Sequence, residues 1–506
     1  MAGKAPADVA IIGFGPVGAM LAGLLGRRGL EVIVVERELD VFALPRAAHI
    51  DHTGLRALQE LGCLDRVLPQ MIPNPGLEFV TADGELLFQL PSDRLSISGL
   101  PASMYFHQPG FDRAVRAAVA ELGNVDIRLG AEMTEFTADA DGVEVATRSR
   151  GGEHARFRAS WLVGCDGAWS PVREGVGIPL EDLSFEEQWL VVDLILQEPM
   201  ASLPSHAIHY CDPARPHTAI PMPNRRYRFE LMLLPGEDPV EVQRPERVFE
   251  ILRHHLPPRA AEIERAAVYT FHGLLAERFR SGRVLIAGDA AHQMPPFLGQ
   301  GMCSGIRDAT NLAWKLGHVV SRRASPALLD TYGSERRPHV GEIIRAAVDF
   351  GRVICTTDPA EAAERDRRIL AHEVSPAERA PFGLPALGPG PLVRAGGGGL
   401  FPQPAARVQG EWLDDVVGQR FLVIARRAGH LGTSSGWWAD AAGALVATVD
   451  QLPAFEADLV RWLDRQGVDV AVVRPDRYVL AAGDGLDRIT AEVRDLLEPQ
   501  PMQASV

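Results

Sequence analysis

The sequence predicts an α/β protein in which a domain of parallel strands and helices is interleaved with a sheet-rich second domain and followed by a small α/β domain. Three observations predict this architecture. A strand–helix–strand pattern with clustered glycines opens the chain, and an alternating strand pattern lies in its middle. A Pro- and Gly-rich stretch then precedes new strand and helix patterns near the C-terminus.

Composition limits the possible functions. A length of 506 residues suggests several domains, and a net charge of −15 disfavours nucleic acid and anionic membrane surfaces as partners. The 5 cysteines lie far apart without a C-x-x-C pair, which argues against a disulfide scaffold and a structural zinc site. We therefore expect a protein of the reducing cytoplasm.

The first elements are a buried parallel strand at residues 9–12, a helix at residues 17–28 and a second strand at residues 31–35. Residues 9–26 carry no charge, so a membrane span or, after Lys4, a signal peptide is the alternative interpretation. The tight cluster of glycines inside this run favours the strand–helix–strand unit without membrane contact.

The turn in this unit is Gly13-Phe-Gly15-Pro-Val-Gly18. Gly13 permits the tight turn, Gly15 lets a diphosphate approach the backbone, and Gly18 lets helix and strand pack closely. Glu36 stands 18 residues after Gly18, where an acid binds a ribose 2′-hydroxyl and repels a 2′-phosphate. A Gly-rich packing turn is the alternative, and it leaves Glu36 unexplained. The predicted dinucleotide contacts here are Gly13, Gly15, Pro16, Val17, Gly18, Glu36 and Arg37.

Further elements follow along the chain. Residues 113–122 predict a helix, whereas residues 161–165 and 283–287 predict buried strands. Apolar residues recur at helical spacing from Met302 onwards, so we expect a helix there with one face packed inward. Residues 226–233 alternate instead, which predicts a strand in a sheet covered on one side only. The residues expected on its covered face are Tyr227, Phe229, Leu231 and Leu233.

The C-terminal region begins after a stretch rich in Pro and Gly at residues 383–406, which predicts a linker or a surface crossing. Beyond it, strand and helix patterns suffice for a separate α/β domain. These patterns occupy residues 420–425, 455–466, 468–473, 478–481 and 486–496. Residues 407–506 contain no cysteine, so we expect interdomain packing or oligomer contacts there, including those of a possible homodimer, and no thiol chemistry.

Two more motifs place an acid after a buried strand. The strand at residues 161–165 runs into Asp166, and the strand at residues 283–287 runs into Gly288-Asp289. Either acid alone could cap the next helix. Beyond Asp289 the chain passes through Pro295 and Gly299-Gln300-Gly301 into the Met302 helix. Taken in this order with the N-terminal turn, these motifs strongly indicate a bound dinucleotide.

In these motifs the sequence resembles the single-component flavoprotein monooxygenases, the class A aromatic hydroxylases that include p-hydroxybenzoate and phenol hydroxylases. It is most similar to 3-(3-hydroxyphenyl)propanoate hydroxylases and related phenol and polyketide hydroxylases. The likeness covers essentially the whole chain, and it is more specific for the flavin than for one substrate. It also rests on Pro45-Arg46-Ala47 with Ile50-Asp51, and on residues 106–109, 211–216, 299–314 and 474–478.

The resemblance implies a p-hydroxybenzoate hydroxylase-like fold. An FAD-binding domain of the Rossmann type would comprise residues 1–75, 101–180 and 270–382, and a substrate-binding sheet domain residues 76–100 and 181–269. Residues 383–408 would form the linker, and residues 409–506 a thioredoxin-like domain without a C-x-x-C pair.

The resemblance also implies individual roles in binding FAD non-covalently. Gly13, Gly15 and Gly18 would hold the diphosphate, and Glu36 the adenosine ribose. Arg46 and Gln108 would contact the diphosphate and ribityl region, and Asp289, after Gly288, the ribityl chain. Asp166 would support both flavin and nicotinamide binding through architecture. The expected lining of the isoalloxazine includes Pro295, Gly299, Gln300, Gly301 and Met302. From the residues themselves, the positive N-terminus of the Met302 helix suits an anionic reduced flavin.

As the resemblance implies, NADH or NADPH is a transient reductant, and O2 forms a flavin C4a-hydroperoxide that hydroxylates a phenolic ring. The expected substrate is 3-(3-hydroxyphenyl)propanoate or a similar hydroxyaryl acid. The alternative is a tailoring hydroxylase or epoxidase of an aromatic polyketide or other bulky phenol. A flavin halogenase is set aside because the 8 tryptophans never form W-x-W. A flavin-binding regulator would show no substrate-stimulated reduction.

Three residues are candidates for acting on the substrate. Asp51 is the first candidate for a base that deprotonates the phenol, with a helix N-cap as the alternative. His209 and Arg215 fall in the expected substrate sheet, where a guanidinium suits a carboxylate; both could equally be solvated strand residues. His292 is expected to belong to the scaffold of the flavin motif. The other histidines lack ligand spacing, so we expect no metal.

Overall fold

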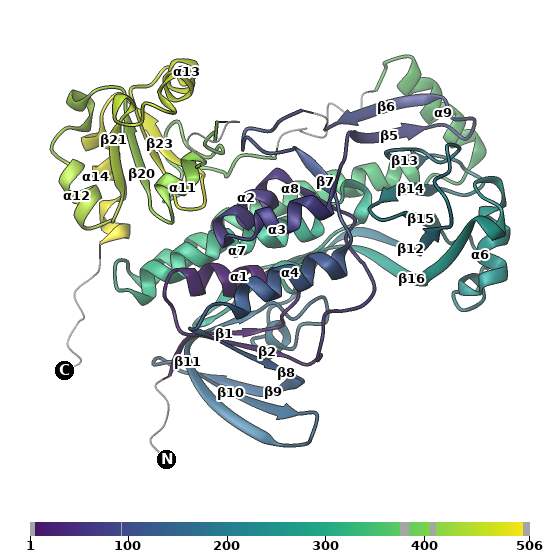
Figure 1. The fold of residues 1–506 in the computed structure, drawn as a ribbon, viewed down its shortest axis with the longest axis horizontal. Helices are drawn as coiled ribbons and strands as arrows, with labels where there is room; N and C mark the ends of the chain where they lie inside the picture. Colours follow the sequence, from purple (N-terminus) through teal and green to yellow (C-terminus); the bar gives the residue numbers. More distant parts are fainter. Residues whose placement is uncertain (1–5, 93, 375–383, 405–410, 499–506) are drawn as a thin grey trace.

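The computed structural model describes residues 6–92, 94–374, 384–404 and 411–498. These residues form two eight-stranded sheets, a four-stranded sheet and a small three-stranded sheet (Figure 1). The α/β fold class is therefore confirmed. Parts of the ranges predicted for the domains and the linker lie outside the described residues, namely 1–5, 93, 375–383, 405–410 and 499–506.

The first sheet contains the N-terminal unit. Its main path runs β17-β18-β11-β1-β2-β8, with parallel pairing from β18 to β8, and β10 and β9 extend it from β11. The strands are β1 (Ala7–Ile12), β2 (Val32–Glu36), β8 (Val125–Leu129), β9 (Ala131–Ala138), β10 (Val143–Ser149), β11 (His154–Gly164), β17 (Arg280–Ser281) and β18 (Val284–Ile286). The strands predicted at residues 9–12, 31–35, 161–165 and 283–287 all belong to this sheet.

The second sheet is mostly antiparallel, in the order β19-β16-β12-β15-β14-β13-β5-β6. Its strands are β5 (Gly76–Val80), β6 (Leu86–Pro91), β12 (Leu180–Leu196), β13 (Ala207–Tyr210), β14 (His217–Met222), β15 (Arg226–Met232), β16 (Ala261–Ala276) and β19 (His292–Gln293). The expectation that this sheet is covered on one side is wrong for β15. Tyr227 and Phe229 join an apolar core, but Arg228 and Glu230 on the opposite face are also buried.

The three-stranded sheet contacts the second sheet, where the Ala207 N–H donates to the Tyr105 hydroxyl at 2.8 Å. It contains β3 (His49–Asp51), β4 (Ile72–Pro73) and β7 (Ser103–Tyr105), in the order β3-β7-β4. The antiparallel register pairs His49 with Tyr105 and Asp51 with Ser103. This sheet therefore brings side chains from two distant segments to one place.

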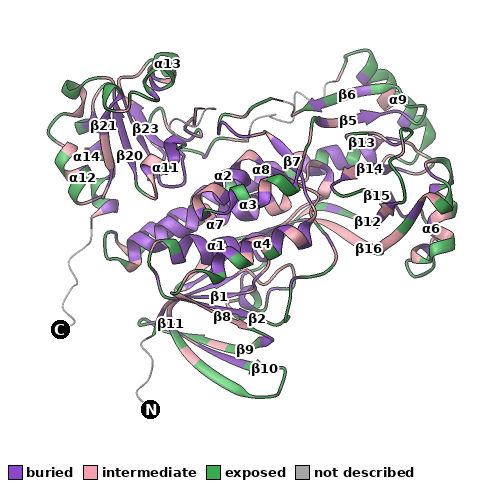
Figure 2. Cartoon of the chain, in the orientation of Figure 1, coloured by how far each residue is buried: buried purple, intermediate pink, exposed green. Residues whose placement is uncertain are grey.

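The helices up to residue 370 pack around these sheets. They are α1 (Pro16–Arg27), α2 (His52–Leu61), α3 (Leu64–Val67), α4 (Gln108–Ala120), α5 (Pro171–Gly175), α6 (Pro245–Ile251), α7 (Gly301–Val320), α8 (Asp330–Ile354) and α9 (Pro359–Leu370). Nearly all of α7 is buried, so its prediction as a helix with only one inward face understates the packing (Figure 2). Within the described ranges, no helix has the length and apolar character required to cross a bilayer.

The C-terminal part forms the four-stranded sheet in the order β21-β20-β22-β23, beside α7 (Figure 1). The aromatic rings of Phe421 and Trp314 make an edge contact across this boundary, with centroids 5.4 Å apart. The elements are β20 (Leu422–Ala425), β21 (Leu445–Thr448), β22 (Val470–Val473), β23 (Val479–Gly483), α11 (Leu413–Val417), α12 (Ser435–Asp440), α13 (Glu456–Gln466) and α14 (Leu486–Leu497). All five predicted segments are present, whereas β21, α11 and α12 were not predicted.

The segment before this domain contains no helix or strand over its described residues 384–404, yet it is not a simple exposed linker. Leu392 is buried in the main core, Phe401 in the C-terminal core, and Leu387 and Val393 pack against Tyr478. This stretch is therefore an integral strap between the two parts of the molecule.

Candidate active site

A cavity of ≈1360 Å³ lies where the first two sheets and the small sheet meet. The N-termini of α1 and α7 border it through residues 15–17 and 299–302. Free backbone N–H groups and the positive ends of two helix dipoles therefore face one space. Its other walls include β3, β7, the buried face of the second sheet, residues 94–97, one face of α8 and residues 384–385.

Two histidines hold the short turn η6 (Pro296–Leu298), which immediately precedes α7. His49 Nε2 lies 3.3 Å from the carbonyl oxygen of Leu298, and His209 Nε2 lies 3.1 Å from that of Phe297. Because a carbonyl oxygen only accepts, each imidazole carries a proton on Nε2. Burial lowers the pKa of both rings, that of His209 to about 4, so both are neutral near pH 7.

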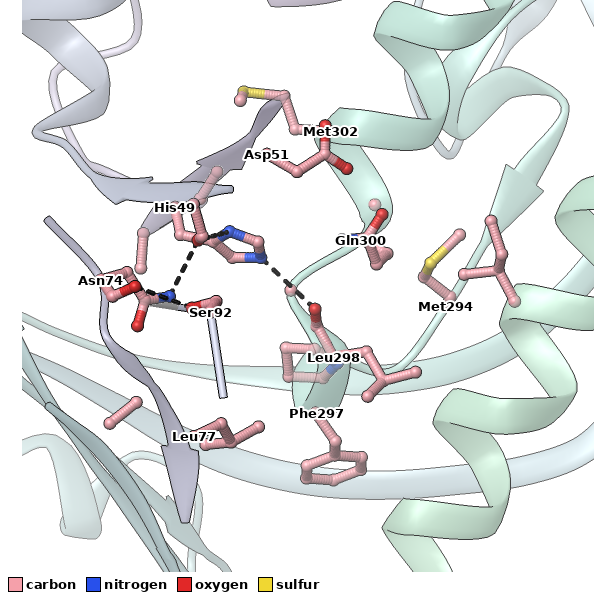
Figure 3. Close-up of a pocket in the computed structure, with 18 of the residues that line it drawn as sticks. His49, Asp51, Asn74, Leu77, Ser92, Met294, Phe297, Leu298, Gln300 and Met302 are labelled. Atoms are coloured by element: carbon pink, nitrogen blue, oxygen red, sulfur yellow. Dashed lines mark hydrogen bonds between the residues drawn. The ribbon is translucent and has the colours of Figure 1, made fainter. Parts of the chain in front are cut away.

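The other nitrogen of His49 ends a directed chain of hydrogen bonds. His49, Asn74 and Ser92 lie on one side of the pocket in Figure 3. A neutral ring with its proton on Nε2 accepts at Nδ1, here from Ser103 Oγ at 3.0 Å. The Ser103 oxygen accepts from Asn74 Nδ2 at 2.9 Å. Ser92 Oγ donates to the main-chain carbonyl oxygen of Asn74 at 2.7 Å and so holds the Asn74 backbone in place. This chain fixes the tautomer and the orientation of His49.

A second group of side chains fixes the loop that carries Arg46. Arg228, which is fully buried, donates to the carbonyl oxygens of Pro45 at 2.8 Å and Arg46 at 2.7 Å. Its charge is balanced by Asp193, 2.7 Å away on the neighbouring strand. Gln108 Oε1 accepts from the Arg46 N–H at 2.7 Å. The loop is therefore held by both large sheet domains.

The two acids that follow buried strands have different surroundings. Asp166 accepts from Ser170 Oγ at 2.5 Å and from the Val172 N–H at 3.0 Å, so it stabilises the start of α5. Asp289 is exposed and lines the cavity. The turn that carries Asp289 is fixed by Asp308, which accepts from the Gly288 N–H at 3.1 Å.

Comparisons with known proteins decide which family this site belongs to. Residues 6–347 match the family model described as an FAD binding domain, and residues 398–496 match the HcaD C-terminal domain. A "probable NADH-specific resorcinol 4-hydroxylase" of Rhodococcus jostii (strain RHA1) is 37% identical, with 98% of this chain and 94% of that protein covered. The chain belongs to the FAD-dependent aromatic hydroxylases.

Other known proteins are similar to this enzyme in sequence or in fold. A 3-(3-hydroxy-phenyl)propionate/3-hydroxycinnamic acid hydroxylase of Klebsiella pneumoniae (strain 342) is 35% identical over 94% of this chain and 91% of its own. The crystal structure of a p-nitrophenol 4-monooxygenase from Pseudomonas putida DLL-E4 is 27% identical, with a TM-score of 0.67, covering 74% of this chain and 95% of its own. An aklavinone-11 hydroxylase in complex with FAD and aklavinone shares the fold, with a TM-score of 0.80 at 24% identity over 98% and 100% of the two chains.

The residues of this chain fit FAD as the cofactor of the enzyme. A Cβ atom built on Gly15 would meet nothing within 4 Å, whereas one on Gly18 would lie 2.1 Å from the Gly13 carbonyl oxygen. Open space therefore lies in front of Gly15, where the predicted diphosphate would approach, and tight packing lies behind it. Beside this space stand Arg46 and Gln108, which suit a diphosphate and polar hydroxyl groups.

The predicted FAD contacts divide into two groups. One group lines the cavity: Gly15, Pro16, Val17, Arg46, Gln108, Asp289, Gly299, Gln300, Gly301 and Met302. The other group is not part of its described lining: Gly13, Gly18, Glu36, Arg37, Asp166, Gly288 and Pro295. Glu36 ends β2 and accepts from the Phe14 N–H at 2.8 Å, whereas the Arg37 side chain is largely exposed.

The three predicted substrate residues also differ in position. Asp51 lines the cavity, but its Oδ1 accepts from the Thr53 N–H at 2.9 Å and caps α2, as the alternative interpretation expected. Burial alone would raise the pKa of Asp51, yet Arg307, 2.7 Å away, holds that pKa well below its usual range. A carboxylate in this state is a weak base, so we do not retain Asp51 as the base. His209 lines the cavity, with both ring nitrogens already hydrogen-bonded.

Arg215 requires a correction. Its guanidinium pairs with Glu237 at 2.7 Å and donates to the Met232 carbonyl at 3.0 Å, and it is not among the described residues that line the cavity. Hydrogen bonding from Arg215 lowers the pKa of Glu237 to about 2. Arg215 therefore fixes the end of β15, and we withdraw its predicted contact with a substrate carboxylate.

Sequence reasoning missed several residues of the site. His49, Ser103 and Asn74 come from three separate segments, and only their pairing in the small sheet and the loop beside it brings them together. His49 does lie two residues before Asp51, between the segments Pro45-Arg46-Ala47 and Ile50-Asp51, and strand alternation would have placed His49 and Asp51 on the same face. Arg228 occupies the polar face of β15, which the expectation of a one-sided sheet assigned to solvent.

Proposed function

We propose that this enzyme hydroxylates a 3-substituted phenol with NADH and O2. The observation that carries the proposal is the neutral His49 imidazole on the cavity wall, oriented by Ser103 and Leu298. Its Nε2–H contact with Leu298 is long, at 3.3 Å, so this N–H can share its hydrogen with a phenolic oxygen. Donation to that oxygen stabilises the phenolate, which is the better nucleophile for hydroxylation.

The names of the relatives support this substrate class. Resorcinol and 3-(3-hydroxyphenyl)propionate are both phenols with a substituent at the meta position. Because both compounds contain a 3-substituted phenol ring, one cavity wall that binds the ring hydroxyl could accept either of them. The name of the Rhodococcus protein specifies NADH, which supports NADH as the reductant here. Because Arg215 lies off the cavity, a carboxylate on the substrate is not required by the proposal.

The protein contributes binding, orientation and exclusion of water. Bound FAD supplies the activation of O2, which no side chain of the protein can carry out. The N-terminus of α1 and the Arg46 loop would hold the diphosphate, Glu36 the adenosine ribose, and Asp289 the ribityl chain. Leu77, Ile220 and Phe271 form apolar walls around the substrate region and keep water from the reacting ring. His209 fixes Phe297 and with it the turn before α7.

The test is a screen of FAD-loaded enzyme for NADH oxidation, O2 uptake and hydroxylated product. Resorcinol, 3-(3-hydroxyphenyl)propanoate, 3-hydroxycinnamate and fused-ring phenols are compared, with benzene-ring acids lacking a hydroxyl as controls. We expect near-stoichiometric product from a single-ring 3-substituted phenol. Product from fused-ring phenols alone would overturn the proposal in favour of the polyketide hydroxylase.

We also propose a cytoplasmic location and retain the homodimer as a possible assembly. The 5 cysteines are all free thiols in the structure, which supports a reducing compartment. Light scattering on the purified enzyme measures the assembly directly: a mass near twice 54.9 kDa indicates the dimer, and a mass near 54.9 kDa contradicts it.

A further inference from the structure

One buried guanidinium connects the N-termini of α2 and α7 beside the cavity. Arg307 lies two turns inside α7, and only 2% of its side chain is exposed. Its Nη1 donates to Asp51 Oδ2 at 2.7 Å and to Thr53 Oγ1 at 3.1 Å. Its Nη2 donates to Gln300 Oε1 at 2.7 Å and to Ser304 Oγ at 3.0 Å.

The two acceptors occupy equivalent positions. Asp51 is the N-cap residue of α2, and Gln300 is the N-cap residue of α7. Asp51 uses its Oδ1 to cap α2, which leaves Oδ2 for Arg307. Both residues line the cavity, and Asp51 and Gln300 lie close together in Figure 3. Arg307 therefore fixes the N-termini of α2 and α7 relative to each other in the wall of the cavity.

The contact also fixes which way the Gln300 carboxamide is turned. A guanidinium has donors and no acceptor, so the Gln300 atom that faces Arg307 must be the carbonyl oxygen. The NH2 group is then directed away from Arg307, and Gln300 itself lines the cavity between Gly299 and Gly301. Without Arg307 the carboxamide could turn over and present an acceptor instead.

We infer that Arg307 is a positioning residue that holds the Gln300 carboxamide with its NH2 group toward the cavity. The group recognised there is a hydrogen-bond acceptor carried by the flavin ring or by the phenolic substrate. The measurement of product formed per NADH oxidised rests on the proposed function, whereas the measurements of FAD and resorcinol affinity do not. A fixed donor in a water-poor site stabilises a developing charge without reorganisation, so losing its orientation weakens the reaction more than it weakens the fold.

The test uses the full-length holoenzyme and a double-mutant cycle of Arg307→Lys and Gln300→Met. Lysine keeps a positive charge for Asp51, but a single ammonium on a flexible stem does not reproduce the rigid fork that reaches Asp51 and Gln300 together. We expect Arg307→Lys to fold and to lose about tenfold in product formed per NADH oxidised. Gln300→Met should show the same loss, and the double variant no more than either single variant.

Two binding measurements identify the acceptor. Flavin fluorescence measures the affinity for FAD, and perturbation of the flavin absorbance by resorcinol measures substrate affinity. A weaker FAD complex in both single variants assigns the acceptor to the flavin, and a weaker resorcinol complex assigns it to the substrate. Arg474→Met is the matched control, because Arg474 is equally buried, pairs with Glu335 at 2.8 Å and does not line the cavity. The Arg474→Met variant should have a lower free energy of unfolding and an unchanged ratio of product to NADH oxidised.

Several results would overturn the inference. Wild-type coupling and both wild-type affinities in Arg307→Lys would show that the orientation of Gln300 does not depend on Arg307. Losses that multiply in the double variant would show that the two residues act independently. If no phenol stimulates NADH oxidation in the wild type, the proposed function fails, while the affinities for FAD and for resorcinol still decide the inference.

Discussion

At the scale of single residues, burial and hydrogen bonding decide what each polar side chain can do. Asp51 and His49 lie two residues apart on β3, yet Arg307 holds one as a carboxylate while burial keeps the other neutral. The sequence alone identified Asp51 from its motif and offered both a base and a cap. Only the position of Arg307, 256 residues away, decides between them.

Arg215 provides a direct check on the corrected assignment. Replacing Arg215 with Ala should leave KM and kcat for the phenolic substrate unchanged within about twofold, because the guanidinium pairs with Glu237 outside the cavity. Steady-state kinetics with 3-(3-hydroxyphenyl)propanoate and with resorcinol measures this. A selective rise of KM for the acid, about tenfold or more, would restore the predicted carboxylate contact.

Asp112 on α4 predicts a pH dependence of stability. Burial raises its pKa to about 6, so the folded protein retains a proton that the unfolded chain releases near its ordinary value of 3.8. Its stability contribution is therefore complete below that ordinary value and lost as pH rises through about 6. Asp112→Asn should thus stabilise the protein by about 1–3 kcal/mol at about pH 8 and by little at about pH 4. Urea unfolding at both pH values measures this difference, and an equal effect at both would refute the assignment.

At the scale of elements, the strand–turn–helix at the N-terminus was predictable because local sequence dictates it. The strands β1 and β2 are short apolar runs, and the glycines between β1 and α1 are the residues that a tight strand-to-helix turn requires. The buried polar face of β15 was not predictable, because it depends on the loop around Arg46, nearly two hundred positions away in the chain, for its partners. The packed strap over residues 384–404 was missed because its apolar residues are scattered among Pro and Gly.

The turn between β1 and α1 yields a contrast between two glycines. Gly15→Ala places a methyl group in open space, so the apoprotein should keep its stability while the affinity for FAD falls about tenfold or more. Gly18→Ala forces a Cβ atom to 2.1 Å from the Gly13 carbonyl, so the fold itself should be destabilised. Thermal unfolding of the apoproteins and fluorescence titration with FAD separate the two effects. Unchanged FAD binding in Gly15→Ala would remove the diphosphate from this turn.

At the scale of the whole molecule, buried ion pairs join the C-terminal domain to the helices behind the cavity. Arg474 pairs with Glu335 of α8 at 2.8 Å, and Arg56 of α2 pairs with Asp414 at 2.5 Å. Because charges buried away from water require their partners, the domain belongs to the folded core. The sequence predicted the C-terminal domain, and its lack of cysteine argued against thiol chemistry there. Nothing in the sequence indicated that these charged residues, which lie in separate motifs, would pair.

These buried ion pairs predict that the C-terminal domain unfolds together with the rest of the protein. Calorimetry of the holoenzyme should show one main transition, and Arg474→Met should lower stability by about 3–5 kcal/mol because it leaves Glu335 and Asp476 short of a partner. Two separate transitions, with the variant affecting only the smaller one, would show that the C-terminal domain is an independent module.

The most direct measurement of the central claim is the ionisation of a phenol bound beside His49. ¹³C NMR of phenol labelled at the oxygen-bearing carbon, followed against pH in oxidised holoenzyme, reports its pKa in the site. We expect the bound phenol to ionise about one pH unit lower in the wild type than in His49→Phe, because the Nε2–H stabilises the phenolate. Equal pKa values in the two proteins would contradict the role assigned to His49.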